Sequence, residues 1–429
     1  MIKEEFAFLN RLSDINNNTG VKFLSRAAAP GSHCPLHMAL GTIKAIKGVS
    51  SLVVGMAECG YYSRFVAASP YGGSGELHYV YELDSSEVVF GCREGLKEAL
   101  FSMDREGAKV ITVIITCVPA LIGEDTASLI DELKPLMAAK IVFIDAAHFK
   151  RNGYQYGYFG TIEQLIGILN NTETKAESQD GFINPSTASV NLFGAAGGKE
   201  FELLKEIILE NGYEINEYSG GFSFDDLCRS EKAVLSIIFN RKMLKAGKEL
   251  ENKGVPYVNM ADRYSAVDIE EGYKKIRQLL NLMDYSRLRK GKEYLLKFQQ
   301  EIQKKFEGIT YIATYPELDI LPVAGYLCSL GMIPELLHVE EFEEDSFLHK
   351  ENIIAMGHNP YITYITDRSK VIQTFFDPIP ELSLGSCTGL KQNSWIPDSS
   401  LASLSSLCGF ERSRELLSMI LKTEGGEAK

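Results

Sequence analysis

The sequence lacks the features that mark membrane, secreted and nucleic-acid-binding proteins. Its longest apolar stretch, residues 108–123, is interrupted by Lys109 and Pro119 and is too short for a membrane span. The first residues lack the basic start and apolar run of a signal peptide, so we expect a soluble, cytoplasmic protein. Basic residues are few: 44 Lys and Arg stand against 57 Asp and Glu, for a net charge of −13. That charge disfavours nucleic acid and anionic membranes as main partners.

Two common cofactor motifs are also absent. No GxxxxGK[ST] phosphate-binding loop occurs, so we expect any ATP that is used to bind to a partner protein. None of the eight cysteines forms a CxxC pair, which disfavours a structural zinc site. A cytoplasmic location makes structural disulfides unexpected.

Strand-like runs alternate with helical patterns along the 429 residues. Short β-branched runs at 51–56, 109–116 and 140–145 are separated by segments with helical spacing of apolar residues, a pattern typical of βαβ units and a parallel sheet. The alternation resumes after a polar linker at 171–185. The sequence therefore predicts an α/β fold made of several such units.

We predict three α/β domains: residues 1–185, residues 186–300 with a bridging helix, and a shorter third domain at 301–429 with a C-terminal helix. Some elements are predicted within them by apolar spacing. These are a long helix over 231–252, a helical segment over 274–306, and strands over 352–356 and 371–376.

Three cysteines occupy positions suited to ligand binding. Cys59 lies three residues beyond the strand that ends at Met56, and Cys117 directly follows the strand at 109–116. The carboxyl ends of parallel strands form one crevice, so these two thiols can face the same point. Cys34 precedes a helix that Pro35 begins, where the helix dipole favours a thiolate. Thiolates ligate iron–sulfur clusters, although a cytoplasmic cysteine taken singly is more often a small buried hydrophobe than a ligand.

The segments around these cysteines resemble those of the nitrogenase component 1 family, which contains nitrogenases and nitrogenase-like reductases. Four ordered segments carry the resemblance: CPLHMALG at 34–41, LVVGMAECGYY at 52–62, EVVFG at 87–91 and IITCVPALIGED at 114–125. Weaker similarity continues to about residue 390.

The resemblance implies three Rossmann-like domains, with parallel sheets flanked by helices, and an oxidoreductase. Such a protein is the catalytic component of a two-component system, in which an ATP-dependent iron protein passes electrons through an iron–sulfur cluster to a substrate between the domains. Cys34, Cys59 and Cys117 match the family's cluster ligands. Three thiolates cannot fill a [4Fe-4S] or an eight-iron cluster, so the resemblance also implies a cluster at a subunit interface, in a homodimer or a paralogous heterodimer.

The sequence departs from true nitrogenases at two positions. The cysteine that anchors their catalytic metal cofactor should fall near Ile238, and a late histidine ligand should fall within 375–390, but neither residue is present. We therefore do not expect a standard molybdenum–iron subunit, and we assign no substrate, no catalytic residue and no second metal cofactor. Two alternatives stay open: a non-catalytic scaffold or carrier for metal-cofactor assembly, and a metal-free binding module on the same fold.

Other residues near these segments have two interpretations each. Cys92 is either a tolerated small residue at a turn or a further thiol near the cluster, and Cys228 either packs in the core or touches a cavity. His148 follows the strand at 140–145 and is either a structural histidine or a metal ligand or proton donor. We expect Cys328, Cys387 and Cys408 to be structural.

Overall fold

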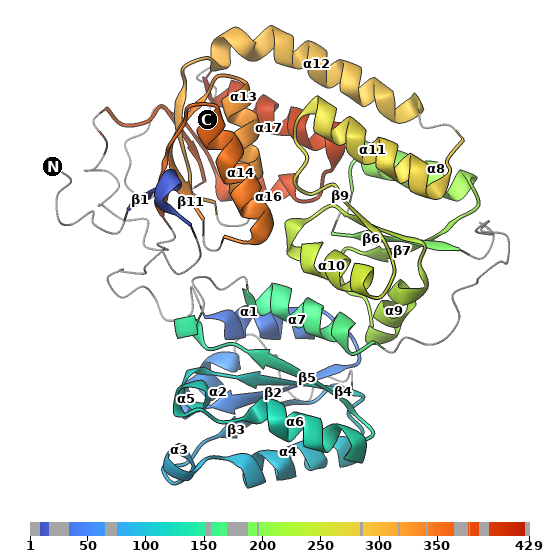
Figure 1. Ribbon diagram of the computed structural model, residues 1–429, viewed down its shortest axis with the longest axis vertical. Coiled ribbons are helices and arrows are strands. Elements are labelled where there is room, and N and C mark those ends of the chain that lie inside the picture. Colours follow the sequence, from blue (N-terminus) through green and yellow to red (C-terminus); the bar gives the residue numbers. More distant parts are fainter. Residues whose placement is uncertain are drawn as a thin grey trace.

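The computed structural model confirms the predicted α/β fold: sheets of mainly parallel strands are flanked by helices in three units (Figure 1). The structure describes residues 9–16, 34–64, 75–150, 156–169, 188–194, 197–283, 286–315, 318–339, 342–363, 376, 378–385 and 394–424. Within these residues no helix is both long and apolar enough to cross a membrane.

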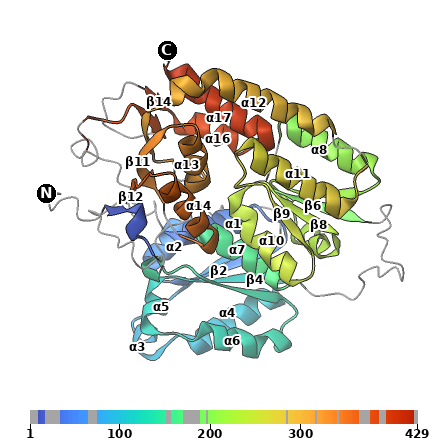
Figure 2. The same ribbon diagram turned by 45° about the horizontal axis from the view of Figure 1, so that its top comes forward.

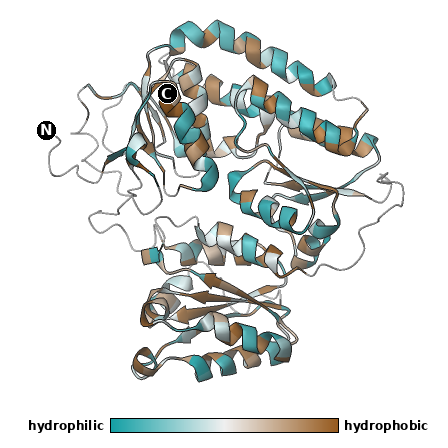
Figure 3. Cartoon of the chain, viewed as in Figure 1, coloured by the Kyte–Doolittle hydropathy of each residue, from teal (hydrophilic) through white to brown (hydrophobic). Residues whose placement is uncertain are grey.

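The first unit is built on a parallel sheet with the strand order β3-β2-β4-β5. Its strands are β2 (Val49–Gly55), β3 (His78–Glu82), β4 (Val110–Ile115) and β5 (Lys140–Asp145). All residues of β2 and β4 are buried, because helices cover both faces of the sheet. Figure 3 shows these strands as brown, apolar arrows between helices of mixed hydropathy.

Each face of this sheet has its own hydrophobic core. Helices α1 (Pro35–Lys44) and α7 (Tyr156–Gly167) pack together on one face. Helices α4 (Arg93–Arg105) and α6 (Thr126–Leu133) cover the other face (Figure 1). The continuous apolar runs of the sequence therefore supply side chains to both cores in alternation.

The second unit has a parallel sheet with the order β7-β6-β8-β9. Its strands are β6 (Ser189–Phe193), β7 (Glu214–Tyr218), β8 (Leu235–Ile238) and β9 (Tyr257–Asn259). The helices around it are α8 (Lys199–Glu210), α9 (Phe224–Arg229), α10 (Leu244–Asn252) and α11 (Ala266–Leu280).

The prediction of one helix over 231–252 is wrong. The buried strand β8 lies in its first half, and only Leu244–Asn252 is α-helical in the second half. A short apolar run such as that at 234–239 fits a buried strand and a buried helix equally well, because periodicity cannot separate the two.

The third unit has a six-stranded sheet with the order β1-β12-β11-β10-β13-β14. Its parallel strands are β10 (Thr310–Ala313), β11 (Ile333–His338), β12 (Tyr361–Thr363), β13 (Leu382–Leu384) and β14 (Ser394–Ile396). The strand β1 (Asn10–Arg11) pairs antiparallel with β12, so residues near the amino terminus complete the last sheet. The predicted domain boundaries stay a prediction.

Helices connect the second and third units into one body with a continuous core. They are α12 (Ser286–Phe306), α13 (Ile320–Ser329), α14 (Glu344–Ala355), α16 (Asp398–Leu404) and α17 (Gly409–Glu424). The C-terminal helix α17 packs on α8, α11 and α12 of the neighbouring region, and Figure 2 shows it beside α12.

Three further predictions about elements can be compared with the structure. The helical segment at 274–306 is two helices, the end of α11 and the whole of α12. The strand expected at 352–356 is wrong, because these residues form the end of α14 and the turn after it. Apart from residue 376, the strand expected at 371–376 lies outside the described residues.

Candidate functional site

The structure brings the three predicted cysteines to one edge of the first sheet. Cys59 lies in the first turn of α2 (Ala57–Ser63), which follows β2, and Cys117 begins α5 (Cys117–Ile122), which follows β4. The two strands are neighbours, with Val54 opposite Ile115, so both helices start at the same edge. Cys34 is the residue before α1, a helix that contacts α2, β2 and β4. Their role as cluster ligands stays a prediction.

Tight packing fixes the strand ends that carry Cys59 and Cys117. A Cβ atom on Gly55 would lie 2.2 Å from the Thr116 Oγ1 and 3.2 Å from the Cys59 Cβ, so only glycine fits at the end of β2. The Thr116 hydroxyl also donates a hydrogen bond of 2.9 Å to the Val54 carbonyl. The backbone next to each cysteine is therefore held against the neighbouring strand.

A second glycine sets the position of the helix that carries Cys34. A Cβ atom on Gly157 of α7 would lie only 1.9 Å from the Pro35 carbonyl oxygen. Helices α1 and α7 thus approach closely, which seats the first turn of α1, and with it Cys34, on the sheet.

The three thiols are near enough to influence one another electrostatically. The pKa of Cys34 is raised to about 11, mainly by burial and to a smaller extent by the neighbouring thiols of Cys117 and Cys59. Burial also raises the pKa of Cys117, with a contribution from Cys59, while a main-chain hydrogen bond from His148 lowers it. The free thiols of Cys34 and Cys117 are therefore protonated at neutral pH, whereas metal binding would deprotonate them.

The donor set fits an iron–sulfur cluster better than a single metal ion. Among the described residues, no group of three or more His, Cys, Asp or Glu is close enough to hold one metal ion. A cluster is wider than an ion, because several irons and sulfides lie between its ligands. Three half-buried thiols from three segments at one surface edge are the donors that such a group requires.

His148 lies next to one of these thiols, a contact that the sequence left open. It follows β5, the neighbour of β4, and its Nδ1 lies 2.8 Å from the Cys117 sulfur. The carboxyl ends of three adjacent strands thus contribute Cys59, Cys117 and His148 to this edge.

The other cysteines lie elsewhere. Cys92 is 1% exposed in the core on the face covered by α4, and burial raises its pKa to about 12. Cys228 packs against the core on the α1 face, and burial raises the pKa of its thiol too. Cys328 and Cys408 are buried, and Cys387 lies outside the described residues.

Apolar side chains are exposed around the cysteine edge. Phe90 in α3 (Glu87–Phe90) is 86% exposed, and Leu121 in α5, one turn beyond Cys117, is 74% exposed. We call the exposed large apolar side chains of α2, α3 and α5 the cysteine-edge patch: Tyr61, Tyr62, Val89, Phe90, Leu121 and Ile122. Figure 1 shows these three helices together at one end of the first unit. Clustered exposed apolar side chains are typical of interaction surfaces.

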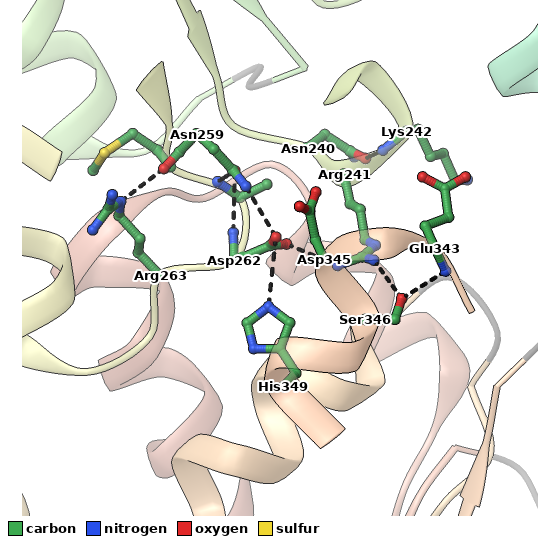
Figure 4. Close-up of polar contacts among 12 residues, drawn as sticks. Asn240, Arg241, Lys242, Asn259, Asp262, Arg263, Glu343, Asp345, Ser346 and His349 are labelled. Carbon is green, nitrogen blue, oxygen red and sulfur yellow. Dashed lines mark hydrogen bonds and ion pairs between the residues drawn. The ribbon is translucent and has the colours of Figure 1, made fainter. Parts of the chain in front are cut away.

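A second polar site, which the sequence analysis missed, joins the second and third units (Figure 4). Arg241, after β8, is 3.3 Å from Asp262, after β9, and donates a hydrogen bond of 2.9 Å to Ser346 in α14. His349, also in α14, is 3.6 Å from the Asp262 carboxylate. The misassigned helix at 231–252 concealed the strand end that places Arg241. In the sequence, the end of this strand is marked only by the polar run that follows Phe239.

Burial and charge oppose each other at this second site. Burial alone would raise the pKa of Asp262, but the His349 hydrogen bond and the Arg241 charge hold it well below its ordinary value. Burial and the Asp262 charge raise the pKa of Asp319 to about 7. A cavity of about 720 Å³ adjoins this second polar site, and its lining residues include Asp262, Asp345 and His349.

A smaller cavity lies between the first and second units. It has a volume of about 330 Å³ and is lined by α1, α7, the loop after β7 and the segment after β8. Its wall includes Met38 and Thr42 of α1, Tyr158 of α7, Phe222 and Lys242.

Comparison with known proteins agrees with the motifs. A family model described as nitrogenase component 1 type oxidoreductase matches residues 34–423. A solved structure, "Nitrogenase Cp1 at pH 6.5", superposes with a TM-score of 0.67 and 14% identity over 95% of this chain and 97% of that chain. A second, "Nitrogenase Cp1 at pH 5", gives a TM-score of 0.53 and 14% identity over 97% and 94% of the two chains. No curated protein matches the sequence. At this identity, the structural likeness shows a shared Rossmann-like fold.

Proposed function

This chain belongs to the nitrogenase component 1 type oxidoreductases, and on that premise we propose that it is the catalytic component of a two-component reductase. An ATP-dependent iron protein supplies single electrons, which enter through an iron–sulfur cluster at a subunit interface. The gathering of Cys34, Cys59 and Cys117 at one sheet edge is the observation that carries this proposal.

The three thiolates would hold the cluster, which when bound supplies reversible one-electron transfer. Because one chain offers three thiols to a group that needs more ligands, a second chain completes the site, either another copy or a paralogue. Both a [4Fe-4S] and an eight-iron cluster satisfy this count. The cysteine-edge patch offers apolar surface for that second chain and for the iron protein.

We assign the substrate to the cavity between the first and second units. One wall of this cavity is α1, the helix that starts directly after Cys34. Met38 is four residues from Cys34, a rise of about 6 Å along the helix. An electron would therefore travel a short distance from the cysteine edge to a molecule in the cavity, and Lys242 in the wall suits a substrate with a negatively charged group.

The test is to replace all three cysteines by serine and purify the protein without oxygen. We expect the native chain to contain iron and sulfide and to absorb visible light, and the triple variant to lose all three properties. The double variant Cys92→Ser, Cys228→Ser is the matched control, and it should keep the iron content of the native chain. Stoichiometric iron in the triple variant would refute the assignment.

The scaffold alternative is supported by the absence of the cofactor-anchoring cysteine. Phe239 follows β8 there, and its carbonyl accepts a hydrogen bond from Arg412. A scaffold would bind iron but would not reduce any substrate with the iron protein, and it would pass its metal group to another protein. Iron-protein-dependent turnover by the purified chain decides in favour of the reductase.

A further inference from the structure

His148 contacts the sulfur of Cys117, one of the three proposed cluster ligands. The exposed imidazole of His148 places its Nδ1 2.8 Å from the Cys117 sulfur. We propose that His148 is a positioning residue that donates a hydrogen bond from Nδ1–H to the ligating sulfur of Cys117 and thereby raises the reduction potential of the bound cluster. This inference rests on the proposed function, since it requires Cys117 to ligate iron.

The direction of the hydrogen bond follows from the chemistry of a ligating cysteine. A cysteine bound to iron is a thiolate and has no proton to donate. The proton in a contact of this length must then belong to the imidazole, so Nδ1 is the donor. The main chain of His148 also favours negative charge on this sulfur, because it lowers the pKa of Cys117.

The turn that carries His148 is held in place by Asp145 at the end of β5. The Asp145 carboxylate accepts a hydrogen bond of 3.1 Å from the Ala147 N–H and pairs with Lys150 at 2.6 Å. The Ala146 N–H extends the ladder by donating to the Ile115 carbonyl at 2.8 Å. The imidazole therefore approaches the sulfur from a braced turn that is anchored to β4, the strand before Cys117.

A hydrogen bond to a cluster sulfur favours the reduced state. Reduction adds negative charge to the cluster and its ligands, and a donor pointed at a sulfur stabilises that charge. Loss of the imidazole should therefore lower the midpoint potential.

The experiment compares the native protein with His148→Phe and His148→Asn. Phenylalanine keeps a ring but removes the donor, whereas the asparagine amide nitrogen can take the place of Nδ1. Each anaerobically purified protein is analysed for iron, titrated potentiometrically with detection by EPR, and examined by pulsed EPR for nitrogen coupling. We expect equal iron contents, a lower midpoint potential in the Phe variant, and a value near the native one in the Asn variant. We also expect a weak nitrogen coupling that disappears with the Phe substitution.

Three results would overturn the proposal. An unchanged potential in the Phe variant would show that the imidazole does not tune the cluster. Loss of iron from the Phe variant would give the side chain a holding role instead, and strong nitrogen coupling in the native protein would make His148 a direct ligand. A native protein without any cluster would refute the proposed function itself, a result that the iron analysis separates from the other three.

Discussion

Removal of the Arg412 guanidinium should strongly destabilise the joint between the second unit and the C-terminal helix. Arg412 is 4% exposed in α17, and its guanidinium lies 4.3 Å from the centre of the Tyr264 ring. It donates hydrogen bonds to four carbonyls at the ends of β8 and β9, those of Phe239, Met260, Ala261 and Arg263, at 2.7–3.3 Å. One side chain of α17 thus supplies hydrogen-bond donors to the carbonyls that follow two strands of the second sheet.

The magnitude follows from these contacts. A hydrogen bond that involves a charged group contributes about 1.5–3 kcal/mol, but four bonds from one group do not add in full. Loss of one partner from a buried charged network typically costs about 3–5 kcal/mol. We therefore expect Arg412→Ala to lower the free energy of unfolding by about 4 kcal/mol, a large part of the total stability of a typical protein.

Urea unfolding followed by circular dichroism measures this loss, and hydrogen exchange of α17 locates it. Arg414→Ala, at an exposed position two residues further along the same helix, is the matched control and should change stability by less than about 0.5 kcal/mol. A loss below about 1 kcal/mol in Arg412→Ala, or equal losses in both variants, would refute the reasoning.

Three more predictions concern other parts of the molecule. Burial raises the pKa of Glu200 from 4.5 to about 7, so the folded chain binds a proton that the unfolded chain releases, and stability falls as pH rises through this window. Between pH 4.5 and 7.5, the free energy of unfolding should fall by up to about 3 kcal/mol less in Glu200→Gln than in the native protein, as measured by urea unfolding. Parallel pH profiles of the two proteins would contradict this prediction. Gly157→Ala should cost about 1–3 kcal/mol and reduce iron content, because its Cβ meets the backbone of α1; unchanged melting and iron content would disprove the packing argument. Leu121→Asp should weaken binding of the iron protein about tenfold or more, as measured by calorimetry. The control is Leu136→Asp, which changes an exposed leucine before β5 at the opposite edge of the same sheet and should leave the affinity unchanged. Equal affinities of the two variants would show that the cysteine-edge patch is not part of the docking surface.

The fold class and the cysteine edge could be predicted from the sequence for physical reasons. Parallel strands buried on both faces appear as continuous apolar runs, and their carboxyl ends must share one edge. That geometry alone places Cys59 and Cys117 together once β2 and β4 are recognised as strands. Cys34 was identified from the helix that follows it.

Other features depend on contacts that no local pattern contains. The pairing of β1 with β12 joins residues about 350 positions apart in the chain. The short strand β8 has no periodicity that separates it from a helix, so the polar cluster at its end was missed as well. The His148 contact depends on the turn that Asp145 braces, and tertiary hydrogen bonds of this kind leave only a weak trace in sequence.

The central claim is that three cysteines from distant segments ligate one iron–sulfur cluster at an interface between two chains. Diffraction from crystals grown without oxygen, recorded at the iron absorption edge, tests it most directly. The account predicts an anomalous peak that touches the sulfurs of Cys34, Cys59 and Cys117 and is closed by ligands of a second chain. The absence of an iron peak at these three cysteines, or iron bound by other residues, would contradict it.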